Sequence, residues 1–211
     1  MGKQLIRSIL AGVSISIGAT IFLALKQVSL PFSAIFFTIG LLIILWYRFD
    51  LYTGKIGYLY CTKSNNITSI LWVLLGNFIG CCIMFAFGGA PTFTAGLLIR
   101  DVAAATMTTK ITIFTSTFGI ATLFQSIICG ILIFVAVEQH NLEKRQWVPF
   151  IAIPAFILAG AEHCVADACY LFAAIVGGWW SWWVIPFFIV IVIGNAIGSI
   201  AFYRIKRSLE K

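Results

Sequence analysis

Residues 155–176 read AFILAGAEHCVADACYLFAAIV, an almost wholly apolar stretch in which Glu162, His163 and Asp167 stand close together. Placing ionisable side chains in an apolar surrounding costs free energy, so in membrane segments such groups usually face a protein interior or a water-filled path. If the stretch crosses a membrane, the three residues mark a functional site. The plain alternative is a set of satisfied buried polar groups.

The composition around this stretch is that of an integral membrane protein. Hydrophobic residues make up 61% of the 211 residues and charged residues 10%, which is too little charge to cover a soluble surface. The net charge of +7 comes from basic residues between apolar runs, so it indicates topology, and no nucleic-acid partner is expected. One transmembrane domain over residues 1–211 is expected. The cysteines are expected to be buried free thiols: Cys61, Cys81, Cys82, Cys129, Cys164 and Cys169.

Six apolar runs are long enough to cross a bilayer, which takes about 20 residues for a helix. They cover residues 5–26, 31–62, 68–88, 111–137, 147–176 and 182–203. The second and fifth runs are too long for simple helices, and polar residues interrupt both. The interruptions read RFDLYTG (48–54) and AEHCVAD (161–167), and they predict that each of these two helices is broken.

The two halves of the chain repeat one pattern. Each half has a plain span, an interrupted span and a span with a GNxIG motif, GNFIG (76–80) in the first half and GNAIG (194–198) in the second. Three spans per half place the halves in opposite orientations, which predicts an inverted 3+3 repeat with the permeation site at the interrupted segments.

The basic residues predict that both termini lie in the cytoplasm. With the N-terminus inside, only Lys26, Arg100 and Lys110 fall in outer loops, and Arg48 falls within a span. This asymmetry follows the positive-inside rule. The basic residues on the cytoplasmic side are then Lys3, Arg7, Lys55, Lys63, Lys144, Arg145, Arg204, Lys206, Arg207 and Lys211.

In the fifth span, the spacing of five residues predicts one helical face. Phe156, Ala159, Gly160, His163 and Asp167 recur at intervals of three, four and seven. The face is typical of a narrow lumen with a phenyl gate and a protonatable group. Asp167, one turn after His163, is expected within hydrogen-bond reach of the imidazole.

The second span supplies a matching set of candidates. Phe37 lies near its start, and Asp50 stands at the break, where it is expected to cap a half-helix or accept from freed amides. Thr53 offers a hydroxyl at membrane depth, and Gly54 is expected to permit irregular backbone.

The segments FDLYTG, GNFIG, AEHCVAD and GNAIG, in this order, resemble the formate/nitrite transporter family, and the resemblance runs through all six spans. It implies an all-α, aquaporin-like fold, assembled as a homopentamer in the inner membrane of a prokaryote, with one pore per protomer. Family members pass small monovalent weak-acid anions such as formate, nitrite, lactate or hydrosulfide.

The same resemblance implies roles for individual residues. Phe37 and Phe156 match two phenyl constrictions, and the loop beside the central His163 is matched by Leu51, Tyr52 and Thr53.

Three positions depart from the family pattern. Asp167 replaces the usual asparagine, and Gly130 stands where the family has another asparagine. Lys110 is the candidate vestibule lysine, although it lies several residues upstream of the expected position. Because the first predicted span starts almost at residue 1, the amphipathic leading helix of the family is not expected here.

A weak acid crosses such a barrier most easily when it is protonated. Moving a carboxylate-sized ion into a low dielectric costs on the order of 20 kcal/mol, whereas protonating an acid of pKa about 4 at neutral pH costs ~4 kcal/mol. Lys110 and the half-helix N-termini would attract the anion. His163 would supply the proton, relay it, or only form a hydrogen bond while water supplies the proton. Glu162 would orient either backbone amides or the histidine.

Two other functions fit parts of the pattern. Asp167 and the missing asparagine would suit a channel for neutral or cationic solutes such as ammonium. A membrane metalloenzyme would use Glu162, His163 and Asp167 with Cys164 and Cys169, but Cys164 follows His163 directly and points away. The sequence therefore favours a transport protein, not an enzyme, and no cofactor or metal is expected.

Overall fold

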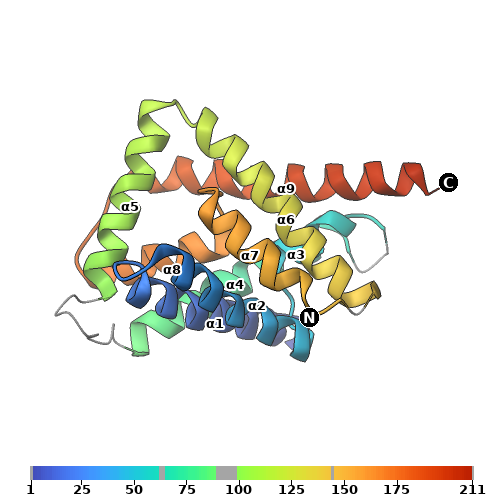
Figure 1. Ribbon diagram of the computed structural model, residues 1–211, viewed down its shortest axis with the longest axis horizontal. Coiled ribbons are helices and arrows are strands. Elements are labelled where there is room, and N and C mark those ends of the chain that lie inside the picture. Colours follow the sequence, from blue (N-terminus) through green and yellow to red (C-terminus); the bar gives the residue numbers. More distant parts are fainter. Residues whose placement is uncertain (1, 62–64, 89–98, 144, 211) are drawn as a thin grey trace.

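The computed structural model describes residues 2–61, 65–88, 99–143 and 145–210, and every regular element in these residues is a helix (Figure 1). The first half contains α1 (Gly2–Leu25), α2 (Leu30–Tyr47), α3 (Tyr52–Lys55), a 3₁₀ turn η1 (Ile56–Tyr58) and α4 (Ile67–Gly88). The second half contains α5 (Ile99–Ser116), α6 (Ile120–Glu143), α7 (Val148–Leu158), α8 (Cys164–Val176) and α9 (Val184–Leu209).

Local chemistry sets the ends of α2. The Ser29 hydroxyl accepts from the N–H of Phe32 at 3.4 Å, and Pro31 stands in the first turn, where a missing N–H is tolerated. The helix ends at Arg48, which takes the left-handed conformation with φ 56°. The main chain therefore leaves the helix at the break that the sequence predicts.

Helix length and composition confirm a multi-pass membrane protein. Among the described residues, α1, α2, α4, α6 and α9 are long and apolar enough to cross a membrane, and α7 and α8 are shorter apolar helices. The predicted runs 31–62 and 147–176 are both broken, the second of them over residues 159–163. The opposite orientation of the two halves stays a prediction.

The predicted fourth span, 111–137, is wrong in its bounds. A turn separates α5 from α6, with Phe118 at φ 51° and Gly119 at φ 76°, and Gly119 accepts this left-handed conformation without strain. The apolar pattern continues across this turn, so periodicity alone does not reveal it. Residues 89–98, between the third and fourth predicted spans, lie outside the described residues, as do Lys63, Lys144 and Lys211.

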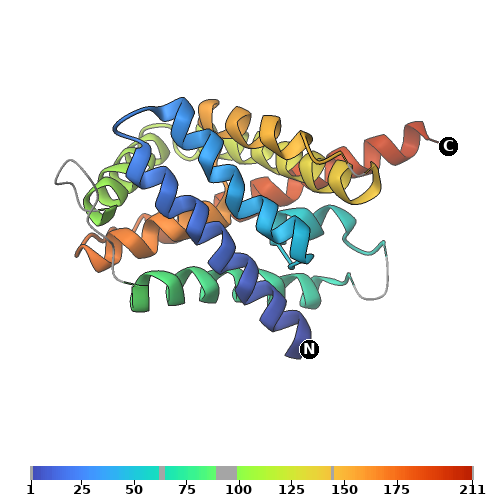
Figure 2. The same cartoon turned by 60° about the horizontal axis from the view of Figure 1, so that its bottom comes forward.

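Two helix pairs form the frame of the molecule. α1 packs against α4, α6 packs against α9, and the half-helices α2 and α7 lie against α1 and α6 (Figure 2). Glycines allow these close approaches. A Cβ on Gly12 would overlap the backbone of Asn77, and a Cβ on Gly130 would overlap the backbone of Asn195 in the same way.

The departure at Gly130 therefore has a structural reason. At this position α6 touches the main chain of α9, and any side chain would separate the two helices. An asparagine, as the resemblance suggests for this position, does not fit here.

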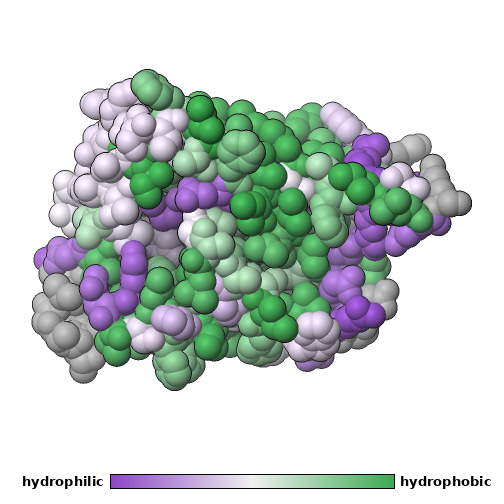
Figure 3. Space-filling view, turned by 45° about the horizontal axis from the view of Figure 1, so that its top comes forward, coloured by the Kyte–Doolittle hydropathy of each residue, from purple (hydrophilic) through white to green (hydrophobic). Residues whose placement is uncertain are grey.

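On the face that Figure 3 shows, apolar residues cover much of the middle, and most hydrophilic residues gather toward the two ends of the long axis. Large side chains such as Trp72, Phe124 and Ile151 are exposed, as expected for lipid or neighbouring subunits. All six cysteines are free. Four are buried and Cys61 is partly buried, but Cys82 is exposed, so the expectation of a buried thiol is wrong there.

We predict that Gly12→Ala and Gly130→Ala each destabilise the folded protein by about 1–3 kcal/mol, because a methyl group at either site overlaps the main chain of the facing helix. Thermal unfolding in detergent measures the effect. Gly2→Ala is the control, since a Cβ there meets nothing. Equal midpoints for all three variants would contradict the close packing.

Candidate functional site

The break between α2 and α3 is held by one buried amide. Asn77 on α4 is fully buried, and its Oδ1 accepts from the N–H of Tyr52 at 2.9 Å. Its Nδ2 donates to the carbonyls of Asp50 at 2.9 Å and Ser8 at 2.8 Å. One side chain thus pairs groups on both sides of the break and ties them to α1.

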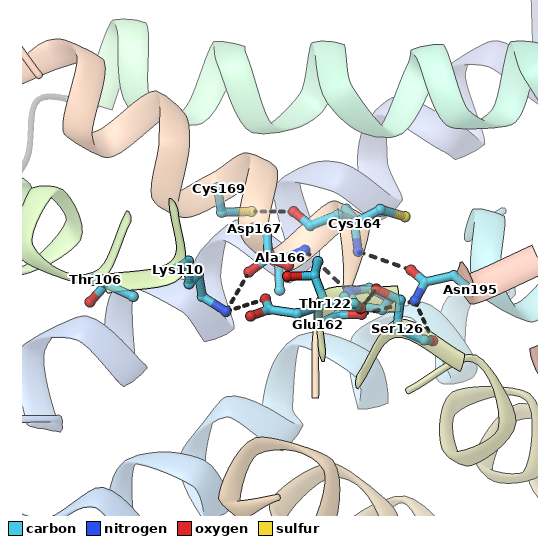
Figure 4. Close-up of polar contacts among 12 residues, drawn as sticks. Thr106, Lys110, Thr122, Ser126, Glu162, Cys164, Ala166, Asp167, Cys169 and Asn195 are labelled. Atoms are coloured by element: carbon cyan, nitrogen blue, oxygen red, sulfur yellow. Dashed lines mark hydrogen bonds and ion pairs between the residues drawn. The ribbon is translucent and has the colours of Figure 1, made fainter. Parts of the chain in front are cut away.

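The break between α7 and α8 is held in the same way. Asn195 on α9 is fully buried, and its Oδ1 accepts from the N–H of Cys164 at 3.0 Å. Its Nδ2 donates to the carbonyls of Glu162 and Ser126, both at 2.8 Å (Figure 4). Gly160, at φ +67°, lies within this break.

Sequence reasoning used the GNxIG motifs to find the repeat but missed what the two asparagines do. A signal was present, because an asparagine in an apolar span needs hydrogen-bond partners and its own helix already pairs the nearby backbone. The unpaired backbone groups of a neighbouring broken helix are the natural partners.

His163 joins the two breaks. It is the N-cap of α8, where its Nδ1 accepts from the N–H of Ala166 at 3.1 Å, and its Nε2 lies 3.0 Å from the Thr53 hydroxyl. Since Nδ1 accepts a hydrogen bond, a neutral imidazole carries its proton on Nε2 and donates it to Thr53. If Nδ1 were protonated as well, its N–H would face the N–H of Ala166, and neither group could accept from the other.

Phenyl rings cover this contact on one side. The ring of Phe156 lies 6.1 Å from the imidazole and meets Phe37 edge to face at 6.2 Å. Phe37 in turn meets Phe22 at 6.1 Å. Phe37 and Phe156 therefore contact each other beside His163, and their role as constrictions stays a prediction. The predicted continuous face from Phe156 to Asp167 is also wrong, because residues 159–163 are not helical.

The other predicted residues of the first break point in different directions. Leu51 is buried and lines a cavity, whereas the Tyr52 hydroxyl donates to the Val192 carbonyl at 3.2 Å. Gly54 lies in α3, where a Cβ would meet Val137 at 3.2 Å, so it permits close packing and not irregular backbone.

Asp50 does not cap a helix. Its carboxylate pairs with Lys55 at 2.9 Å and lies 3.8 Å from Arg7, and Leu51 takes the N-cap position of α3 without a side-chain hydrogen bond. The predicted capping role is therefore wrong.

Two cavities reach toward the His163–Thr53 contact. The cavity that we call the Asp50 cavity holds about 610 Å³ and is lined by Leu51. The cavity that we call the Lys110 cavity holds about 240 Å³ and is lined by Phe156 and His163. Thr53 stands in the chain between Leu51 and Gly54, which line the Asp50 cavity, and it contacts His163, which lines the Lys110 cavity.

A buried ion cluster lines the Lys110 cavity. Lys110 on α5 contacts the carboxylate of Glu162 and lies 3.1 Å from that of Asp167 (Figure 4). Only 5% and 2% of the two acidic side chains are exposed. Asp167 thus pairs with Lys110, and the expected contact with His163 is replaced by this ion pair. The upstream position of Lys110 is explained because α5 is a separate helix packed on α8.

The two breaks repeat this acid–lysine pairing with one difference. Asp50 and Glu162 each accept from an asparagine through the main chain and each pair with a lysine, Lys55 or Lys110. In the first half, the N–H of Tyr52 bonds to Asn77, and Lys55 stands three residues after Tyr52. In the second half, the N–H of Cys164 bonds to Asn195, and Asp167 stands three residues after Cys164. The second break therefore carries an additional negative charge. Among the described residues, no group of three His, Cys, Asp or Glu side chains is arranged to hold a metal ion.

Two broken apolar helices that meet at a buried imidazole beside a cavity are typical of a helical membrane channel or transporter. The family model for formate/nitrite transporters matches residues 1–206, and the chain belongs to this family. Proteins of this family are channels and transporters, not enzymes, and the predicted membership is confirmed.

Solved structures share the fold. A structure described as a pentameric formate channel with formate bound matches with a TM-score of 0.78 at 17% identity, covering 99% of this chain and 96% of that one. A structure described as an FNT family ion channel matches with a TM-score of 0.73 at 18% identity, covering 98% and 89%. No curated protein matches the sequence.

We predict that Asn77→Ala and Asn195→Ala each lower the stability of the folded protein by about 2–6 kcal/mol, because each leaves two backbone groups of a break without a partner at ~1–3 kcal/mol per group. The carbonyls of Ser8 and Ser126 lie within α1 and α6 and keep their helical hydrogen bonds. Thermal unfolding in detergent tests this. Ser208→Ala on α9 is the control, because that hydroxyl bonds only within its own exposed turn. Midpoints that match the control would show that the two amides do not hold the breaks.

Proposed function

We propose that the protein carries small monovalent weak-acid anions, formate and nitrite among them, through a pore in each protomer, either passively or together with a proton. The observation that supports this most is the neutral His163–Thr53 contact at the meeting point of the two broken helices. The cavities beside the two breaks add support, because each has cations in its lining, Lys55 in the Asp50 cavity and Lys110 in the Lys110 cavity.

The barrier favours a neutral permeant. The residues around it, Leu51, Thr53, Phe37 and Phe156, carry no charge, and all are buried. An anion that lost its water here would face a cost on the order of 20 kcal/mol, against ~4 kcal/mol for protonation of a weak acid of pKa about 4 at neutral pH. We therefore propose that the permeant enters as an anion and crosses as the acid.

The hydrogen bonds of His163 limit its role in this process. Its Nδ1 is engaged by the Ala166 amide, so the ring has one proton to offer, on Nε2. We propose that His163 donates a hydrogen bond to the permeant in place of Thr53, and that water in the cavity supplies the transferred proton. The Glu162 carboxylate pairs with Lys110, and the Glu162 carbonyl accepts a hydrogen bond from Asn195.

Flux measurements test the proposal. Purified protein in proteoliposomes should carry formate or nitrite, and uptake should rise as the outside is acidified from about pH 8 to 5. Lactate, acetate and hydrosulfide complete the panel. Methylammonium represents the alternative of a channel for ammonium, which the carboxylates of Glu162 and Asp167 would suit. Uptake of methylammonium without uptake of any anion would contradict the proposal.

We predict that His163→Asn strongly reduces anion flux while the protein stays folded. Asparagine is a good N-cap for α8, but it is too short to place a donor where the Nε2 of His163 meets Thr53. His163→Phe removes both functions and should also lose stability. His140→Asn, in the last turn of α6, is the control. Unchanged flux in His163→Asn at equal protein level would refute the donor role.

We also propose that five copies assemble in the inner membrane of a prokaryote with both termini in the cytoplasm. The pentameric description of the similar structure and the exposed apolar surface support this. We predict that native mass spectrometry in detergent shows a pentamer as the main species, and a stable monomer or trimer would contradict it.

A further inference from the structure

We propose that Lys26, and not Lys110, is the cation that draws anions into the Lys110 cavity. This inference rests on the proposed anion transport and assigns the recruiting role to a residue that the family resemblance does not point to. It follows from how the charged groups of this one cavity are paired.

The charge of Lys110 is already neutralised. Its ammonium group contacts Glu162 and lies 3.1 Å from Asp167, so two carboxylates surround one cation (Figure 4). All three side chains are buried or nearly so, at 16%, 5% and 2% exposed. The cluster carries a net charge of −1 when both carboxyls are ionised and is neutral when one of them is protonated, so in neither state does Lys110 offer an unpaired positive charge to an anion.

Lys26 has a different set of partners. It lies in the turn after α1 and lines the same cavity, where its ammonium group donates to the Thr106 hydroxyl at 2.8 Å and sits 5.8 Å from the Phe22 ring centroid. Both partners are uncharged. Across residues 2–61, 65–88, 99–143 and 145–210, no carboxylate is in ion-pair contact with Lys26.

The position of Lys26 connects the cavity to the barrier. The Phe22 ring beneath its ammonium group meets Phe37, which meets Phe156 beside His163. The Lys26 side chain is partly exposed, so an anion from solution reaches it before the barrier. The cation therefore stands where the anion would collect before protonation.

Lys26 also compensates for Asp167. With Lys26, the two lysines of the cavity balance Glu162 and Asp167. Without Lys26 the cavity would be negative, whereas with an asparagine at position 167 Lys110 and Glu162 would balance by themselves. The effect of Lys26 should therefore depend on Asp167.

The competing explanation is a lysine that only anchors the end of α1 at the membrane surface, with its stem on apolar side chains. Such a role depends on the length and polarity of the side chain, and it does not involve Asp167. Uptake by a set of charge variants separates the two explanations.

The experiment measures formate and nitrite uptake at low, subsaturating concentration in intact cells that express the protein, so that every copy faces the same way. The variants are Lys26→Gln, Lys26→Arg, Asp167→Asn and the double variant Lys26→Gln/Asp167→Asn. Arg100→Gln is the matched control, because it removes one exposed cation from α5 at a residue that does not line the cavity.

We expect Lys26→Gln to reduce uptake roughly tenfold, within the range by which charged clefts change association rates. Lys26→Arg and Arg100→Gln should stay close to wild type, and the double variant should regain most of the lost uptake. High salt should reduce wild-type uptake toward that of Lys26→Gln, since ~1 M salt shortens the Debye length to about 3 Å. This last comparison needs no substitution.

Three results would overturn the inference. In the first, Lys26→Gln and Arg100→Gln reduce uptake equally. In the second, the double variant takes up the anion as slowly as Lys26→Gln. In the third, wild-type uptake does not change with salt concentration. Any of these results, with normal wild-type transport, refutes the role of Lys26 but not the proposed anion transport. Absence of anion uptake by the wild-type protein refutes the proposed function itself, and the inference with it.

Discussion

A helix that breaks inside a membrane must find new partners for the backbone groups that it frees, and two buried asparagine amides meet this requirement here. Asn77 and Asn195 each bond to groups on both sides of a break and to a neighbouring helix, in both cases to a residue 69 positions earlier. An unpaired backbone group in hydrocarbon costs several kcal/mol, so without these amides the breaks would not persist. Every feature of the site depends on them, because they fix where Thr53 and His163 meet.

The same requirement sets the chemistry of His163. The N-terminus of α8 needs an acceptor, and Nδ1 of the imidazole provides it. The ring is then neutral and presents one donor toward Thr53, in a barrier of aromatic and aliphatic side chains. Charged side chains line both cavities, among them Asp50 and Lys55 in the Asp50 cavity and Lys110 in the Lys110 cavity. A weak acid suits this arrangement, because it is charged in water and neutral after binding one proton.

The membrane class, the two breaks and the family could be predicted from the sequence because each depends on local pattern: apolar runs, polar interruptions and repeated GNxIG motifs. The turn before Ile120 was missed because apolar residues continue through it. The sequence pairs Asp167 with His163 because one turn of helix separates them. In the structure Asp167 pairs with Lys110, which lies on α5, a helix that the sequence did not reveal. The ion pair is preferred because it is stronger than a hydrogen bond between neutral groups. Contacts between distant segments decide such pairings.

The protonation state of His163 is the most direct test of its two proposed roles, the cap of α8 and the hydrogen-bond donor toward Thr53. Nitrogen NMR of protein with labelled histidine resolves Nδ1 and Nε2, and a His140→Asn sample identifies the signals, since the chain has two histidines. We expect a neutral ring at about pH 7, with the proton on Nε2 and an unprotonated Nδ1 that accepts from Ala166. An imidazolium would contradict this, because Nδ1 could no longer accept from Ala166 and the cap of α8 would be lost. A neutral ring with its proton on Nδ1 would contradict it too, because the cap and the donor toward Thr53 would both be lost.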